Sequence, residues 1–296
     1  MLIPEGALPL FHSHRPDRRA VSPIAMVVSA ISLAVAVPVA AQSVAGESSI
    51  TYADLADLAL DAPLAITAEV RRTSKIDPSR TGPVRPGWAR IYVEAETKSL
   101  LAGTAPIGEK LKYLADVKLT AKGKVPKLKG ETVVLFARAV PGSSDEIQLV
   151  APDAQIPVRQ VNTTSLRGLL TEKLSQDAPP VVTGVRDALH TPGNLAGEGE
   201  TQIFLKTKDG SPASIAVVRA PGQPPVWGLS TGELVQIDAR PPRPATLEWY
   251  RLACSLPATL PPEAQLASDP ALRQQASADY ATVIGQLGPC ERKRAF

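Results

Sequence analysis

Histidine is scarce in this sequence, and the scarcity bears on one short motif. The chain has three histidines, His12, His14 and His190. The segment GLSTG, residues 228–232, matches the G-x-S-x-G pattern in which a serine on a tight turn acts as a nucleophile. Such a serine needs a base, normally a histidine that follows it in the chain. No histidine follows Ser230, so the sequence predicts that GLSTG is not a nucleophile elbow.

The residues that flank this serine predict a hairpin instead. Two prolines stand shortly before it and leave room for only a very short strand. Residues 233–237 alternate polar and apolar side chains, as a half-buried strand does. Gly228 and Gly232 are therefore expected in a turn between two strands. A hydrolase that uses Ser230 or His190 is the alternative, and the missing partners disfavour it.

Aromatic residues are also sparse, at 4% of the chain, although lysines gather in one stretch. Lysines that point out from a strand and its following loop would form a cationic face for a polyanion or an acidic protein of the cell envelope. Nucleic acid is disfavoured, because base stacking needs aromatic side chains and only Tyr92 and Tyr113 lie nearby. The alternative is a solvated strand and loop whose lysines protect a sheet edge from aggregation. The candidate binding face comprises Lys110, Lys112, Lys118, Lys122, Lys124, Lys127 and Lys129.

Only two cysteines occur, Cys254 and Cys290, so the chain lacks the ligands of a cysteine-rich zinc site. They are far apart in the sequence, whereas redox-active pairs usually stand two residues apart. In an exported chain such a pair is most simply a disulfide, and we predict one between Cys254 and Cys290. Closing a loop of this length stabilises the fold by about 4 kcal/mol in the chain-entropy model. No metal site and no cofactor is expected.

Apart from one stretch near the N-terminus, the sequence has no apolar run long enough to span a bilayer. In that stretch three arginines precede an uncharged apolar run over residues 24–39, and small residues follow up to Ala41. This order predicts a secretory signal peptide over residues 1–41, cleavage after Ala41 and a periplasmic location. A membrane anchor is the alternative, which the shortness of the run disfavours. The choice between the general and the twin-arginine export route stays open, as does a translation start downstream of Met1.

Residues 42–157 are predicted to form a first domain, a small β-barrel. A short helix begins after its cap at Thr51. Five strand-like stretches follow, separated by turn residues, and most of them alternate apolar and polar side chains. Several short strands with glycine-bounded loops and no long helix are similar to an OB-type barrel. The five stretches are residues 63–70, 89–95, 111–119, 132–139 and 147–150.

Residues 158–296 are predicted to form a second domain of the α+β class with antiparallel hairpins, in a chain that is α+β and mostly β overall. An amphipathic helix opens it, with its cap at Asn162 or Thr163. A hairpin is expected to turn at the dipeptide Asp209-Gly210. Two helices end the chain, and the predicted disulfide would pin them to each other. Their expected limits are a cap at Thr246 for the first, and Ser268 or Asp269 to Gly288 for the second.

The chain carries no recognisable set of catalytic groups. Glu198 and Glu200 stand in one loop without an evident partner, and His190 is more simply a structural histidine on a strand. Metal-ligand clusters, phosphate-binding loops and cysteine nucleophiles are missing from the sequence. The sequence therefore favours a non-catalytic binding or interaction protein of the cell envelope. A barrel that inhibits an exported enzyme by docking on it is a further alternative.

Three passages carry a resemblance to known sequences: GEGETQIFLKTKDG, TLEWYRLACSLPATLP and the terminal LGPCER. They are similar to a group of uncharacterised exported proteins of alphaproteobacteria, sphingomonad-like species in particular. The resemblance covers most of residues 42–296 and implies an exported location. It implies no activity and assigns no catalytic residue.

Overall fold

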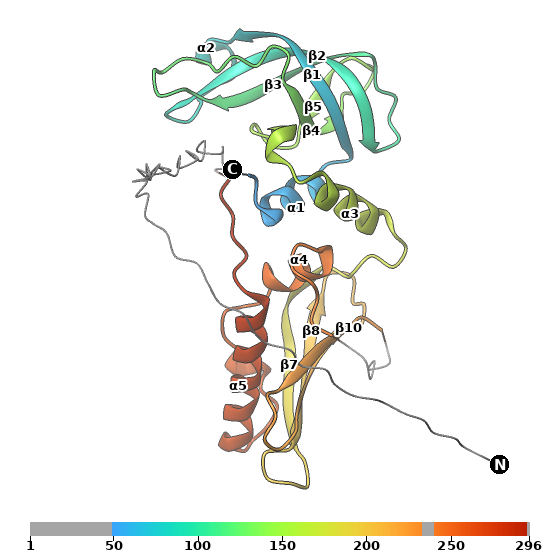
Figure 1. Cartoon of the computed structure of the whole chain (residues 1–296), viewed down its shortest axis with the longest axis vertical. Coiled ribbons are helices and arrows are strands. Elements are labelled where there is room, and N and C mark those ends of the chain that lie inside the picture. Colours follow the sequence, from blue (N-terminus) through green and yellow to red (C-terminus); the bar gives the residue numbers. More distant parts are fainter. Residues whose placement is uncertain (1–48, 233–239, 295–296) are drawn as a thin grey trace, which may run out of the picture. The chain divides into compact units, whose positions relative to one another are not determined.

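A computed structural model describes residues 49–232 and 240–294 of the chain (Figure 1). The predicted signal peptide and the expected strand over residues 233–237 lie outside the described residues. Within them, no helix combines the length and the apolar character that crossing a bilayer requires. The described chain is mixed α and β, with more strand than helix, and its strands pair into antiparallel sheets.

The first sheet contains the five predicted strands, which are confirmed, and one further short strand. Its hydrogen-bonded order is β3-β2-β1-β4-β5, and β6 also pairs with β4. In the described part of the chain no ladder joins the two edge strands, and one parallel bridge links Lys112 of β3 to Glu146, the residue before β5. The elements of this region are α1 (Tyr52–Asp61), β1 (Leu64–Lys75), α2 (Pro78–Thr81), β2 (Trp88–Ala102), β3 (Lys110–Lys118), β4 (Thr132–Ala139), β5 (Ile147–Leu149), β6 (Gln155–Pro157), η1 (Val158–Gln160) and α3 (Thr163–Leu174).

Hydrophobic patterning explains this arrangement. The continuous apolar run of β4 is buried on both sides, with Val133 to Ala137 all at 1% exposure or less. The alternating strands β1, β2 and β3 instead turn one face to the core and one to solvent. The helix α1 begins as predicted at Thr51, whose hydroxyl accepts a hydrogen bond from the Asp54 N–H (3.1 Å). Leu166, Leu169 and Leu170 of α3 pack into this first core cluster, although α3 follows the predicted domain boundary at Pro157. Leu174, at the end of α3, is exposed.

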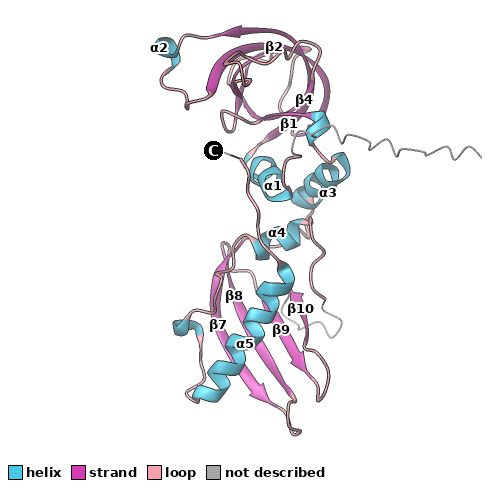
Figure 2. Ribbon diagram, turned by 60° about the vertical axis from the view of Figure 1, so that its left-hand side comes forward, coloured by secondary structure: helices cyan, strands magenta, loops and turns pink. Residues whose placement is uncertain are grey.

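The second sheet has the order β10-β9-β8-β7 and is antiparallel throughout. Helix α5 runs across one face of it (Figure 2). Ile203 and Ile215 of the sheet and Tyr280 and Val283 of α5 belong to one buried cluster, so this helix supplies the core that the sheet needs. The elements are β7 (Val182–Pro192), β8 (Gly199–Thr207), β9 (Ser214–Arg219), β10 (Val226–Ser230), α4 (Leu247–Ala253), η2 (Pro262–Ala264) and α5 (Pro270–Leu287).

The predicted helix limits and the predicted disulfide are confirmed. Thr246 caps α4 by accepting from the Trp249 N–H, and Asp269 caps α5 by accepting from the Ala271 N–H. Gly288 ends α5 with a φ of 72°, a conformation that favours glycine. Cys254 at the end of α4 and Cys290 beyond α5 form the disulfide that joins the two helices.

Two turn predictions need correction. Gly228, expected in a turn, lies inside β10 opposite Ala216, because Trp227 and Leu229 bury their side chains in strand alternation. The hairpin at Asp209-Gly210 is present, and Gly210 has a positive φ of 80°. However, the connection spans residues 208–213 and is not a two-residue turn, because Thr207 and Asp209 both bond to Ser211 within it.

Candidate functional site

The structure divides the seven predicted lysines into two groups. Lys110 and Lys112 lie on β3 opposite the carboxylates of Glu96 and Glu94 on β2. The ammonium of Lys112 also forms an ion pair with Asp145 at 3.2 Å, which raises the pKa of Lys112. The charges of these two lysines are therefore offset by neighbouring carboxylates, and they are poor candidates for an anion site.

The other five lysines, together with one that was not predicted from the sequence, form an exposed set whose ammonium groups make no close ion pair within the described residues. Lys75 at the end of β1 joins them because β1 runs beside the loop that links β3 to β4. Among the described residues, the lysine ion pairs within 4.0 Å involve Lys98 and Lys112 and none of this set. We call this set the lysine surface: Lys75, Lys118, Lys122, Lys124, Lys127 and Lys129.

The loop that carries most of the lysine surface is held by specific contacts. The N–H of Gly123 donates to the Thr120 carbonyl (2.8 Å), and the N–H of Thr120 donates to the Lys124 carbonyl (2.9 Å). Leu128 is 8% exposed and anchors the loop in the core. The end of the loop pairs with β1, where the Gly130 N–H donates to the Val70 carbonyl (2.8 Å). The lysines are thus presented on an ordered backbone.

A surface hollow of about 650 Å³ lies beside this loop. Three members of the lysine surface, Lys75, Lys127 and Lys129, line it together with Thr73 and apolar residues. None of the described residues that line it is acidic. Three ammonium groups around one hollow create a positive potential that attracts a multiply charged anion, and the hydroxyl of Thr73 adds a hydrogen-bonding group.

His190 belongs to a buried polar network between the second sheet and α5. Its Nδ1 lies 2.8 Å from the Thr201 hydroxyl, which donates to the carboxylate of Asp279. Arg219 donates to the same carboxylate from its Nε at 2.5 Å. Burial lowers the pKa of His190. The positive charge of Arg219 also lowers this pKa, whereas the negative charge of Asp279 raises it. A neutral, hydrogen-bonded histidine that is 6% exposed fits a structural role.

Ser230 and His190 are not brought together. Ser230 ends β10 and is 3% exposed, whereas His190 lies on β7 at the other edge of the sheet. Three strand spacings separate them, which amounts to roughly 14 Å. A nucleophile and its base must lie within hydrogen-bonding distance. The two residues therefore do not form one catalytic site in this arrangement.

The acidic pair Glu198 and Glu200 has local structural contacts. The Glu198 carboxylate accepts the backbone N–H groups of Asn194 (3.0 Å) and Leu195 (3.1 Å), which fixes the connection between β7 and β8. Glu200 accepts from the side chain of Gln202. In the part of the chain that the structure describes, no group of three or more metal-ligand side chains comes together.

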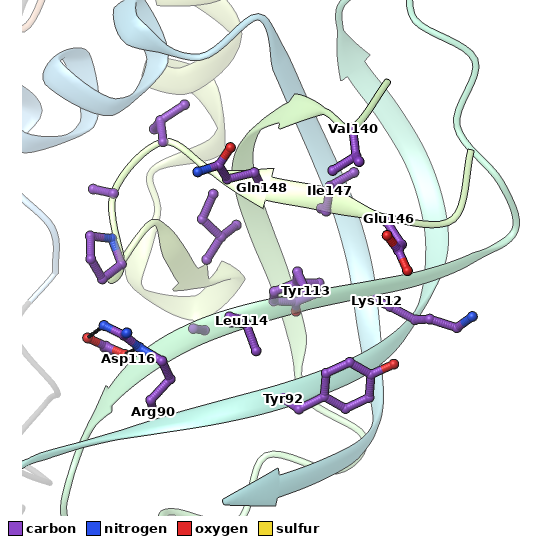
Figure 3. A pocket seen from close by; sticks show the side chains of 15 residues that line it. Arg90, Tyr92, Lys112, Tyr113, Leu114, Asp116, Val140, Glu146, Ile147 and Gln148 are labelled. Atoms are coloured by element: carbon purple, nitrogen blue, oxygen red, sulfur yellow. Dashed lines mark hydrogen bonds and ion pairs between the residues drawn. The ribbon is translucent and has the colours of Figure 1, made fainter. Parts of the chain in front are cut away.

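A second hollow, of about 520 Å³, lies between β3 and β5 and was not predicted from the sequence (Figure 3). Leu114 and Tyr92, directly opposite each other on β3 and β2, line one side of it. Its signal in the sequence is Leu114, an apolar residue on the face of β3 that otherwise carries Lys112, Asp116 and Lys118.

A scan against protein-family models and a comparison with curated protein sequences give no match for this chain.

Proposed function

We propose that this protein is an exported, non-catalytic binding protein that holds a polyanionic ligand on its lysine surface. The observation that carries the proposal is the hollow beside Lys75, Lys127 and Lys129, which is lined by three ammonium groups without a close ion pair and by no described carboxylate. Asp77 interacts electrostatically with Lys75 but does not line the hollow. Phosphate-rich and carboxylate-rich components of the cell envelope have the chemistry that this site recognises. An acidic partner protein would use the same charges.

The energetics of such a site come from several modest charge contacts. An exposed lysine near an anionic surface contributes about 1 kcal/mol at low salt, and the contribution falls as salt screens the charges. Several lysines acting on one multiply charged ligand add up to measurable affinity. A single monovalent anion would gain too little from this exposed site to bind well.

The fold and the compartment are parts of the same proposal. The strand order β3-β2-β1-β4-β5, together with the parallel bridge from Lys112 of β3 to Glu146 just before β5, supports an OB-like barrel for the first region. The pattern of residues 1–41 supports export to the periplasm, and the Cys254–Cys290 disulfide is compatible with an oxidising space. The resemblance to exported alphaproteobacterial proteins points to the same location.

Calorimetry with inorganic tripolyphosphate tests the proposal on residues 42–296. The double variant Lys127→Gln/Lys129→Gln removes two charges from the hollow, and we expect it to weaken binding about tenfold at low salt. A matched control is Lys206→Gln/Lys208→Gln, which removes two exposed lysines from the β8–β9 hairpin and lowers the net charge equally.

The control is expected to bind like the unaltered protein, and binding is expected to be lost at about 0.5 M salt. Equal weakening in both double variants would mean that net charge alone attracts the ligand. No binding at low salt would contradict the proposed site.

A further inference from the structure

The outer edge of β3 is only partly occupied by the chain itself. The N–H of Lys112 donates to the Asp145 carbonyl (2.7 Å), and the N–H of Asp116 donates to the Pro152 carbonyl (2.7 Å). These two hydrogen bonds attach the segment that contains β5 to the two ends of this edge. Leu114 lies midway between the two donors.

The peptide groups of Leu114 point toward that segment and away from β2. In an antiparallel pair, alternate residues of a strand bond to the neighbouring strand, and the residues between them point outward. The Leu119 N–H donates to Gly87 and the Thr97 N–H donates to Glu109, so the odd-numbered residues of β3 bond to β2. Leu114 shares the outward orientation of Lys112 and Asp116.

Opposite Leu114 the two strands separate. Residues 146–151 run between the two attachment points, where β3 needs only residues 113–115 to cover the same span. The longer segment follows β4, with which β5 pairs, and so leaves β3. The hollow of about 520 Å³ lies here, bordered by Ile147 and Leu149 on one side and by Leu114 on the other.

The lining of this seam is apolar in the middle and charged at both ends, where it includes Arg90 and Asp116 at one end and Lys112 and Glu146 at the other. Leu114 is 42% exposed and sits beside the half-buried ring of Tyr92. At one end Arg90 forms two hydrogen bonds to Asp116 (2.7 and 2.9 Å), drawn as dashed lines in Figure 3. At the other end Lys112 pairs with Asp145. Because the cations are paired with carboxylates, this seam gives no strong attraction for an anion.

We propose that the seam between β3 and β5 binds an extended peptide, which pairs with the outward peptide groups of Leu114 and places an apolar side chain against Leu114 and Tyr92. Between the two attachment points, the outward N–H and C=O of Leu114 offer main-chain hydrogen bonds to one residue of such a segment, and the adjacent apolar surface selects its side chain. A glycan fits the lining less well, because the half-buried Tyr92 is the one ring of the lining that solvent reaches, whereas Tyr113 is only 3% exposed. This site is separate from the lysine surface and does not depend on the function proposed for it.

Amide hydrogen exchange by NMR tests the proposal, with the blocked peptide acetyl-Thr-Val-Thr-Val-Thr-amide as the probe. In the free protein we expect the Leu114 amide to exchange much faster than the bonded amides of Lys112 and Asp116. Saturating peptide is expected to slow Leu114 exchange about tenfold or more. The same peptide methylated on both valine nitrogens keeps its side chains and carbonyls. Its N-methyl groups replace the donors to the Leu114 carbonyl and hold that backbone edge away from β3, so we expect it to give no protection.

Two variants separate the backbone from the side chain. Leu114→Pro removes the outward N–H without removing a β2–β3 hydrogen bond, and we expect about tenfold weaker peptide binding. Leu114→Thr keeps that N–H, and we expect it to weaken peptide binding less than Leu114→Pro does. If Leu114→Pro fails to fold, the methylated peptide still decides the question. The variant Lys127→Gln/Lys129→Gln is expected to bind the peptide unchanged, which separates this site from the proposed anion site.

Three results would overturn the proposal. The first is a Leu114 amide that remains unprotected at saturating peptide. The second is equal protection by the unmodified and the methylated peptide. The third is protection of the amide by chitotriose but not by the peptide, which would assign the seam to a glycan.

Discussion

Arg294 and Asp153 form a two-point ion pair across 141 residues of sequence. Both side chains are nearly buried, at 11% and 9% exposure. Just before this pair, the backbone N–H groups of Lys293 and Arg294 donate to the carboxylate of Asp54 at 2.7 and 3.1 Å. The segment that follows Cys290 is thereby fastened to α1 and to the chain that precedes β6.

The first prediction concerns the strength of this fastening. Asp153→Ala leaves the guanidinium of Arg294 nearly buried without its partner, so we expect the free energy of unfolding to fall by about 2–3 kcal/mol. Urea denaturation measures the loss. The exposed Glu291 in the same segment is the control, and Glu291→Ala is expected to change stability by less than about 0.5 kcal/mol. An equal loss of unfolding free energy in the two variants would contradict a specific stabilising contact between Arg294 and Asp153.

The second prediction concerns the disulfide. Cys254 and Cys290 are 36 residues apart, and closing a loop of that length limits the unfolded chain. We expect the free energy of unfolding of the double variant Cys254→Ser/Cys290→Ser to be about 4 kcal/mol lower than that of the oxidised protein. A reducing agent should cause the same loss in the unaltered protein and no loss in the variant. A difference below about 1 kcal/mol would show that the packing of α4 on α5 suffices without the bond.

The third prediction concerns pH. Burial lowers the pKa of His190 below its usual value of 6.5, and Arg219 from β9 assists, while Asp279 from α5 opposes. The unfolded chain therefore takes up a proton at higher pH than the folded chain. The stabilisation that follows is complete above pH 6.5 and is lost as the pH falls through 6.5 toward the lower, folded pKa.

His190→Gln should flatten this part of the pH profile. We expect the difference in unfolding free energy between the unaltered protein and the variant to shrink between about pH 7.5 and pH 5. Carboxylates elsewhere titrate in both proteins and cancel in the comparison. Parallel profiles over this range would contradict a neutral, buried His190.

The fourth prediction concerns Ser230. It is 3% exposed and roughly 14 Å from His190 across the sheet, so its hydroxyl lacks both access and this base. A fluorophosphonate probe is expected to leave Ser230 unlabelled under conditions that label a serine protease added as a positive control. Stoichiometric labelling at Ser230 would instead support a hydrolase.

Local patterns sufficed to predict most of the individual elements. Alternation predicted β1, β2 and β3, and a continuous apolar run predicted the doubly buried β4. Side-chain caps such as Thr51 and Thr246 marked helix starts, because the capping contact joins residues three apart. The disulfide followed from having only two cysteines in a chain expected to be exported.

Relationships between distant residues could not be predicted in the same way. Lys75 belongs to the lysine surface although it was not predicted, whereas the predicted Lys110 and Lys112 do not. The pairing of β1, β2 and β3 decides which charges become neighbours, and a local pattern does not contain this pairing. The seam at Leu114 depends on where the segment after Asp145 leaves β3. Gly228 was misplaced because a glycine in a strand and a glycine in a turn give the same local signal.

Lysine footprinting shows directly whether the lysine surface binds a polyanion. Residues 42–296 would be acetylated briefly with and without saturating tripolyphosphate at low salt, and the modification of each lysine would be quantified by mass spectrometry. We expect strong protection of Lys75, Lys127 and Lys129, with Lys206 and Lys208 modified equally in both samples. Uniform protection of all lysines, or protection of none at the hollow, would contradict it.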